Sequence, residues 1–143
     1  MATIAFDVHP SDPERSLGFE FWIDSVCVFD SNAVITATTI THDFDDEQDS
    51  EHEFRMVLKN KYPNFTTVDD AGNIVSDSTL ALGNFRLEDI DITQIVHDRA
   101  VYQHNFNGSA DDINDQFFGT MGCNGTVSLR FTTPIYVWLL EVM

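Results

Sequence analysis

Hydrophobic and polar residues alternate with a period of two along most of this chain, a pattern typical of β-strands with one buried face. The clearest case is residues 52–61, where His52 and three apolar side chains share one parity and charged side chains take most of the other. The same criterion predicts strands over residues 3–8, 19–29, 33–41, 79–87 and 126–133, with weaker strand patterns over 90–96 and 100–104.

Turn-forming residues separate these segments and indicate how they pair. Ser31-Asn32 predicts a turn that joins residues 19–29 and 33–41 into an antiparallel hairpin. Within residues 79–87 the apolar parity changes at Gly83-Asn84, which predicts a β-bulge.

Two segments depart from simple alternation. Residues 109–119 begin with Ser109 as a helix cap, continue with acids in the first turn and end at Gly119, which predicts one short helix. Residues 135–142 are apolar on both parities, which predicts a central strand covered on both faces or a strand in an interface.

These elements predict the fold class. About eight strands, one short helix and no alternation of strands with helices indicate an all-β antiparallel β-sandwich, jelly-roll-like, with a β-barrel as the alternative. The chain has 143 residues and contains neither an internal repeat nor a linker, so we expect a single domain over residues 1–143.

Composition and charge limit the classes of molecule that this chain is expected to bind. The chain carries 24 acids against 7 bases, a formal net charge of −17, which argues against binding to nucleic acid or to an anionic membrane surface. No signal peptide and no membrane-spanning run is visible, so we expect cytoplasmic synthesis with reduced cysteines, which is compatible with a phage or virus particle component. Cys27 lies on the core parity and is expected to be a packing residue.

The strongest charge feature is the segment at residues 42–51, which holds six carboxylates and no cation. Its alternating acids resemble the opening of an EF-hand loop, but Gln48 and Phe54 stand where such a loop needs Gly and Glu. Two interpretations therefore remain: a solvated acidic loop, or a looser calcium site whose candidate ligands are Asp43, Asp45, Glu47 and Asp49.

A second candidate site centres on Trp22, which lies on the polar parity of its strand between Glu20 and Asp24. An outward indole flanked by carboxylates suits a sugar-binding platform, because the flat face packs on the ring while the oxygens bind its hydroxyls. The alternative is that a loop or the second sheet covers Trp22.

No motif for catalysis is present: the sequence lacks a G-x-S-x-G elbow, a phosphate-binding loop and a dinucleotide fingerprint. We therefore predict a non-catalytic protein, first of all a self-associating structural or assembly β-domain that forms a homo-oligomer, such as a phage or virus particle component. The alternative is a carbohydrate-binding module, with or without calcium. An enzyme of unknown class comes third, because no nucleophile–base pair can be named.

Overall fold

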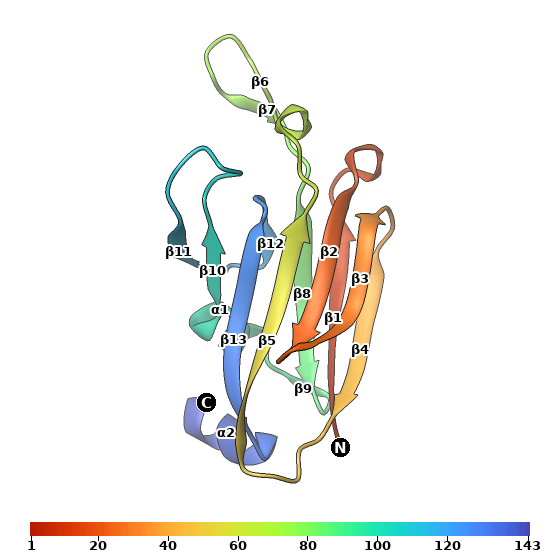
Figure 1. The fold of residues 1–143 in the computed structure, drawn as a ribbon, viewed down its shortest axis with the longest axis vertical. Helices are drawn as coiled ribbons and strands as arrows, with labels where there is room; N and C mark the ends of the chain where they lie inside the picture. Colours follow the sequence, from red (N-terminus) through yellow and green to blue (C-terminus); the bar gives the residue numbers. More distant parts are fainter.

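Two stacked antiparallel sheets, one behind the other in Figure 1, make up the computed structural model, which describes residues 1–143. The five-stranded sheet has the order β12 (Thr120–Met121), β8 (Leu80–Leu87), β1 (Ala2–Pro10) and β4 (Thr38–Phe44), and β9 (Ile90–Asp91) pairs with β8. The six-stranded sheet has the order β11 (Ile113–Gln116), β10 (Val101–His104), β13 (Gly125–Thr133), β5 (Ser50–Lys59), β2 (Leu17–Ile23) and β3 (Val26–Val34). The predicted antiparallel β-sandwich is therefore confirmed, and a closed barrel does not apply.

Smaller elements decorate the sandwich. A two-stranded ribbon of β6 (Thr67–Val68) and β7 (Ile74–Ser76) projects beyond the sheets at the top of Figure 1. Two 3-10 turns, η1 (Pro13–Arg15) and η2 (Pro63–Phe65), precede β2 and this ribbon. The two α-helices are α1 (Thr93–Arg99) and α2 (Ile135–Val142), and neither is long and apolar enough to cross a membrane.

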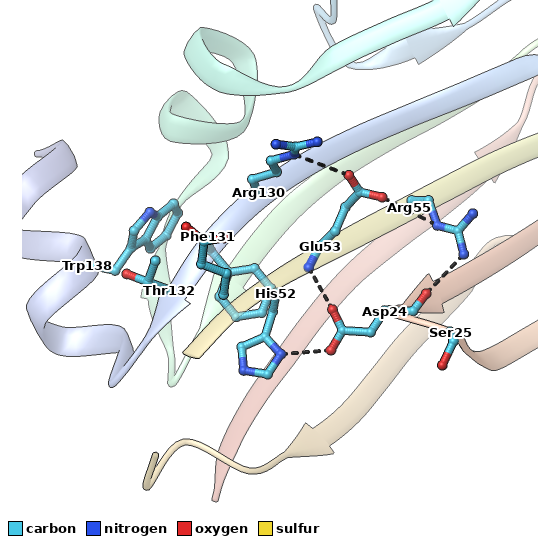
Figure 2. A pocket seen from close by; sticks show the side chains of 10 residues that line it. Asp24, Ser25, His52, Glu53, Arg55, Arg130, Phe131, Thr132 and Trp138 are labelled. Carbon is cyan, nitrogen blue, oxygen red and sulfur yellow. Dashed lines mark hydrogen bonds and ion pairs between the residues drawn. The ribbon is translucent and has the colours of Figure 1, made fainter. Parts of the chain in front are cut away.

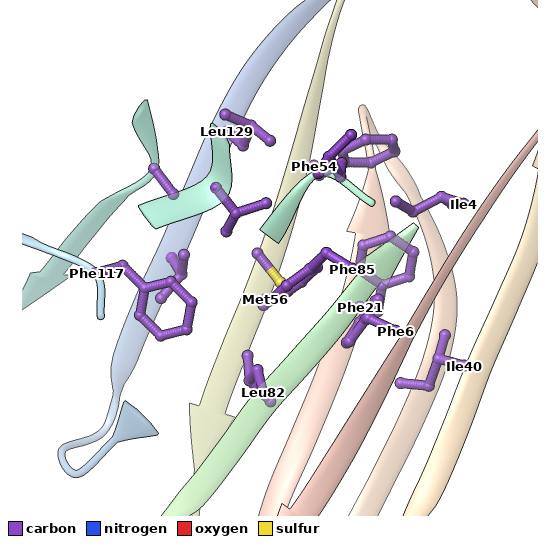
Figure 3. Close-up of a cluster of buried hydrophobic side chains, with 14 of the residues drawn as sticks. Ile4, Phe6, Phe21, Ile40, Phe54, Met56, Leu82, Phe85, Phe117 and Leu129 are labelled. Atoms are coloured by element: carbon purple, nitrogen blue, oxygen red, sulfur yellow. The ribbon is translucent and has the colours of Figure 1, made fainter. Parts of the chain in front are cut away.

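Phenylalanine side chains fill much of the space between the sheets (Figure 3). Phe54 stacks on Phe131 with ring centroids 4.2 Å apart, and Phe6 stacks on Phe85 at 5.1 Å. Each fully buried side chain of this size contributes about 1.5–3 kcal/mol through burial, and aromatic pairs add about 0.5–1.5 kcal/mol. The inward parities of β5 and β13 supply this core as the alternation predicted.

The predicted bulge in β8 is confirmed. The pairing of β1 with β8 shifts between Ala5–Arg86 and Asp7–Gly83, and Asn84 adopts a left-handed φ of 54°. The extra residue returns Leu80, Leu82, Phe85 and Leu87 to the same buried face.

The predicted hairpin of residues 19–29 with 33–41 is wrong. The chain turns earlier, at Asp24-Ser25, so that β2 pairs with β3, while β4 lies in the other sheet. Asp24 takes φ 52°, and its hydrogen bonds to β5 hold the turn in place. The alternation continues in the sequence across the turn while the chain reverses, and Cys27 in β3 is exposed rather than packed in the core.

Three other assignments are corrected. The segment predicted as a helix at 109–119 instead contains β11, which gains backbone partners by pairing with β10. Residues 135–142 form the helix α2 rather than a strand, because their apolar side chains also satisfy helical spacing: Ile135, Trp138 and Leu139 are buried. Within the weak strand pattern at 90–96, only β9 is extended and α1 follows it, burying Ile95 and Val96.

Candidate functional site

An open pocket of about 530 Å³ lies where β5 begins and β13 ends, beside the β2–β3 turn and α2 (Figure 2). Only two of its ten lining residues are hydrophobic, Phe131 and Trp138. The others are polar or charged: Asp24, Ser25, Glu51, His52, Glu53, Arg55, Arg130 and Thr132. The volume lies within the range of roughly 300–1,000 Å³ that is usual for small-molecule sites.

The β2–β3 turn fixes Asp24 at one side of this pocket. The Asp24 N–H donates to the Glu53 carbonyl at 2.9 Å, and the Glu53 N–H donates back to Asp24 Oδ1 at 2.9 Å. Arg55 Nη2 also donates to the Asp24 carbonyl at 2.9 Å. These bonds offset the cost, about 1–2 kcal/mol, of the left-handed backbone at a residue with a Cβ.

His52 lies between Asp24 and Ser50. Its ring stacks on Phe131 with centroids 5.3 Å apart and an interplanar angle of 28°. Nδ1 lies 2.7 Å from Asp24 Oδ2, and Nε2 lies 2.7 Å from Ser50 Oγ. An ionised carboxylate can only accept, so Nδ1 carries the ring proton and Nε2 of the neutral ring accepts from Ser50.

Two arginines and a glutamate form the rim of the pocket. Glu53 forms an ion pair on each side, with Arg55 Nε and Arg130 Nε each 3.6 Å from one of its oxygens (Figure 2). The Arg130 side chain is 90% exposed. Exposed ion pairs contribute about 0–1 kcal/mol, so a ligand can recruit these guanidinium groups at little cost.

The predicted ligand residues fall into two neighbouring places. Asp24 lines the pocket, whereas Glu20 and Trp22 lie on the outer face of β2. The Trp22 indole N–H donates to Glu20 at 2.7 Å, and the Arg55 guanidinium lies 5.3 Å from the centre of the Trp22 ring. Arg55 therefore connects the indole with the pocket, and sugar binding by these three residues stays a prediction.

Glu20 belongs to a charged network on the same face. Lys59 Nζ lies 2.8 Å from Glu20 and 2.6 Å from Asp30. The hydrogen bonds from Lys59 and then from Trp22 lower the pKa of Glu20 below its usual value, despite partial desolvation. The Glu20 carboxylate is thus a fixed anion whose oxygens already have partners.

The predicted metal ligands are not gathered. Asp43 lies in β4 and accepts from the Thr3 hydroxyl at 2.5 Å, and Asp45 accepts from the Glu47 N–H at 2.9 Å. Glu47 and Asp49 are exposed in the short loop that joins β4 to β5. No group of three or more His, Cys, Asp or Glu side chains is arranged to hold a metal ion. The donor set thus does not fit calcium as arranged.

Sequence reasoning missed the pairing of Ser50 and His52. The two residues are two apart on β5, so a common face was predictable from the strand period. Their partner Asp24 was a candidate for another reason, and its contact with His52 depends on the unpredicted turn at residues 24–25.

Comparisons with known proteins give matches in fold alone. No protein-family model and no curated protein sequence matches this chain. The selenomethionine form of vCBM60, from work on two families of calcium-dependent carbohydrate-binding modules, aligns with a TM-score of 0.57 at 8% identity over 90% of each chain. The complex of vCBM60 with galactobiose aligns with a TM-score of 0.52 at 12% identity, over 89% of this chain and 96% of that one.

These findings correct the leading functional hypothesis. A self-associating structural or particle component was predicted in part from an apolar terminal strand, but that segment is the helix α2, which packs on β13. The solved structures that share the fold are carbohydrate-binding modules, which favours the alternative over the assembly hypothesis. The predicted homo-oligomer loses the same support.

Proposed function

We propose that this protein is a carbohydrate-binding module and that its ligand occupies the pocket between the β2–β3 turn and α2. The observation that carries the proposal is the lining of this pocket, in which eight of ten residues are polar or charged and two are aromatic. The fold also supports the proposal, because both similar solved structures are vCBM60, one of them in complex with galactobiose.

The donor and acceptor set of the pocket matches a polyhydroxyl ligand. Each sugar hydroxyl both donates and accepts, so it pairs well with a carboxylate beside a guanidinium. Glu53 lies between Arg55 and Arg130 and provides this combination twice. Hydrogen bonds to charged groups are worth about 1.5–3 kcal/mol each, which makes these three side chains the main expected contributors to affinity.

The charge distribution favours a neutral sugar. The pocket presents both signs, with Asp24, Glu51 and Glu53 against Arg55 and Arg130. The whole chain carries a net charge of −17, which repels polyanionic glycans at moderate ionic strength. Neutral oligosaccharides such as galactobiose are therefore the first ligands to test.

The experiment is isothermal titration of the wild-type protein and two arginine variants with galactobiose and a panel of neutral oligosaccharides. Arg130→Ala should weaken binding about tenfold or more through the loss of one charged hydrogen bond. Arg99→Ala is the matched control, because Arg99 is equally a surface arginine but lies at the end of α1, outside the pocket. Unchanged affinity in Arg130→Ala, or absence of heat with every sugar, would refute the proposal.

A further inference from the structure

We infer that Ser50, His52 and Asp24 form an array that activates the Ser50 hydroxyl as a nucleophile toward carboxylic esters. This activity goes beyond sugar binding and does not depend on it, since Ser50 is not among the residues that line the pocket.

The order and distances of the three side chains suit general-base catalysis. Asp24 Oδ2 lies 2.7 Å from His52 Nδ1, and His52 Nε2 lies 2.7 Å from Ser50 Oγ. A nucleophile, a base and a group that orients the base within hydrogen-bond reach are the required parts. The Asp24 carboxylate also stabilises the imidazolium that forms when His52 takes the Ser50 proton.

The neighbouring hydroxyl of Thr133 does not displace this arrangement. Thr133 Oγ1 donates to the Gln48 carbonyl at 2.5 Å, so its hydrogen is already used. The Ser50 hydroxyl has two acceptors within reach, His52 Nε2 at 2.7 Å and Thr133 Oγ1 at 3.1 Å. The imidazole nitrogen is closer and more basic, so the Ser50 proton points to His52.

The base is held rigidly while the nucleophile is open to solvent. His52 stacks on Phe131, and Asp24 is fixed by the Glu53 N–H. The His52 side chain is only 20% exposed, whereas Ser50 is classed among the exposed residues at the start of β5. An ester can therefore reach Ser50 Oγ without a change in the fold.

The reaction balances with water as the second substrate. Ser50 Oγ attacks the ester carbonyl and its proton moves to His52 Nε2; the ester C–O bond then breaks as His52 returns the proton to the leaving alcohol. Water repeats the sequence on the acyl-Ser50 intermediate, and releases the carboxylic acid. Because the chain carries a net charge of −17, the substrate class is neutral esters rather than anionic ones.

The test uses a fluorophosphonate probe and p-nitrophenyl acetate on the full chain. Attack by Ser50 on the probe forms a P–O bond and releases fluoride, so intact-mass and peptide analysis should find a single adduct on Ser50. General-base assistance should accelerate acetate ester hydrolysis on the order of 10²- to 10⁴-fold over solvent-only attack, and Ser50→Ala should abolish this increment.

Ser109→Ala is the matched control, because the Ser109 hydroxyl is also exposed but donates only to the Phe106 carbonyl. This variant should react like the wild type. An adduct at other serines but not at Ser50, or equal hydrolysis by Ser50→Ala and wild type, would overturn the inference. The sugar titration of Ser50→Ala should match the wild type, so failure here is distinguishable from failure of the proposed sugar site.

Discussion

Replacing Asp24 by Asn tests the proton arrangement at His52 with the smallest possible change in shape. Asn tolerates the left-handed backbone at this position, where φ is 52°, and its Oδ1 can still accept from the Glu53 N–H. Its Nδ2, however, donates where the carboxylate accepted. The His52 ring must then accept at Nδ1 and carry its proton on Nε2, which points the proton at Ser50 and removes the base.

The expected effects on stability and on reactivity differ in size. A hydrogen bond to a charged group is worth about 1.5–3 kcal/mol. The Asp24 side chain is 47% exposed, so after solvent screening we expect a loss of roughly 0.5–1 kcal/mol and a Tm lower by about 2–4 °C. The base is lost altogether, so ester hydrolysis should fall by on the order of 10²-fold or more.

Long-range ¹H–¹⁵N spectra distinguish the two imidazole tautomers and provide the assay. At neutral pH the wild-type His52 should be protonated on Nδ1 and the Asp24→Asn variant on Nε2, with the signals assigned by their loss in His52→Gln. A wild-type ring protonated on Nε2, or the same tautomer in both proteins, would refute the reasoning about Ser50–His52–Asp24.

Three further predictions concern the scaffold and the acidic segment. Lys61→Ala should destabilise the fold by about 3–5 kcal/mol in urea unfolding, because the Lys61 side chain is 2% exposed and its loss strands the partly buried Asp77 carboxylate, 2.6 Å away. Partial burial raises the pKa of Asp77, but hydrogen bonds from Lys61 and Thr66 lower it by more, so the pKa in the folded protein lies below the usual value of 3.8. The stability that the ionised Asp77 contributes is therefore present above pH 3.8 and is lost as the pH falls through the lower folded pKa. This loss of stability in acid should be shallower in Lys61→Ala. Asp46→Ala should cost about 0.5–2 kcal/mol in the same assay, because its carboxylate accepts from the first N–H of α2, that of Ile135, at 2.6 Å; an unchanged midpoint would show that the helix does not need this cap. Since the acids at residues 42–51 are not arranged around a common point, calcium should shift the thermal midpoint no more than Mg²⁺ does at constant ionic strength; a saturable shift specific to calcium, about 2.7 kcal/mol at a hundredfold excess over Kd, would contradict this.

The sandwich was predictable because alternation determines both the element and its buried face. In β5 and β13 the polar and apolar parities are distinct, and both strands were placed within two residues. In α2 the apolar residues occupy both odd and even positions, so their spacing does not distinguish a strand from a helix. The segment was therefore predicted as a strand. The turn at Asp24-Ser25 was missed because alternation across it continues in the sequence while the chain reverses.

The candidate site was predictable only in part. Asp24 was found because acids flank Trp22 in the sequence, and this local pattern survives in the structure. The pocket itself brings β2, β5 and β13 together, and contacts such as Ser50 with Thr133 span 83 residues. No periodicity encodes such pairs, since they depend on which strands become neighbours in the sheet.

Hydrogen bonds join the acidic segment to the pocket, so a ligand bound at one of them would change the affinity for a ligand at the other. Gln48, in the loop between β4 and β5, accepts from Thr133 at 2.5 Å, and Thr133 lies 3.1 Å from Ser50. Asp46 in the same loop caps α2, whose Trp138 lines the pocket. A cation that orders residues 45–49 would therefore act on the α2 side of the pocket, where Trp138 lies, and linkage would require the effects to be reciprocal. Because the acids of this segment are not arranged around a common point, galactobiose affinity should be the same in calcium and in EDTA; a rise in sugar affinity with calcium, matched by an equal rise in calcium affinity with galactobiose, would contradict this.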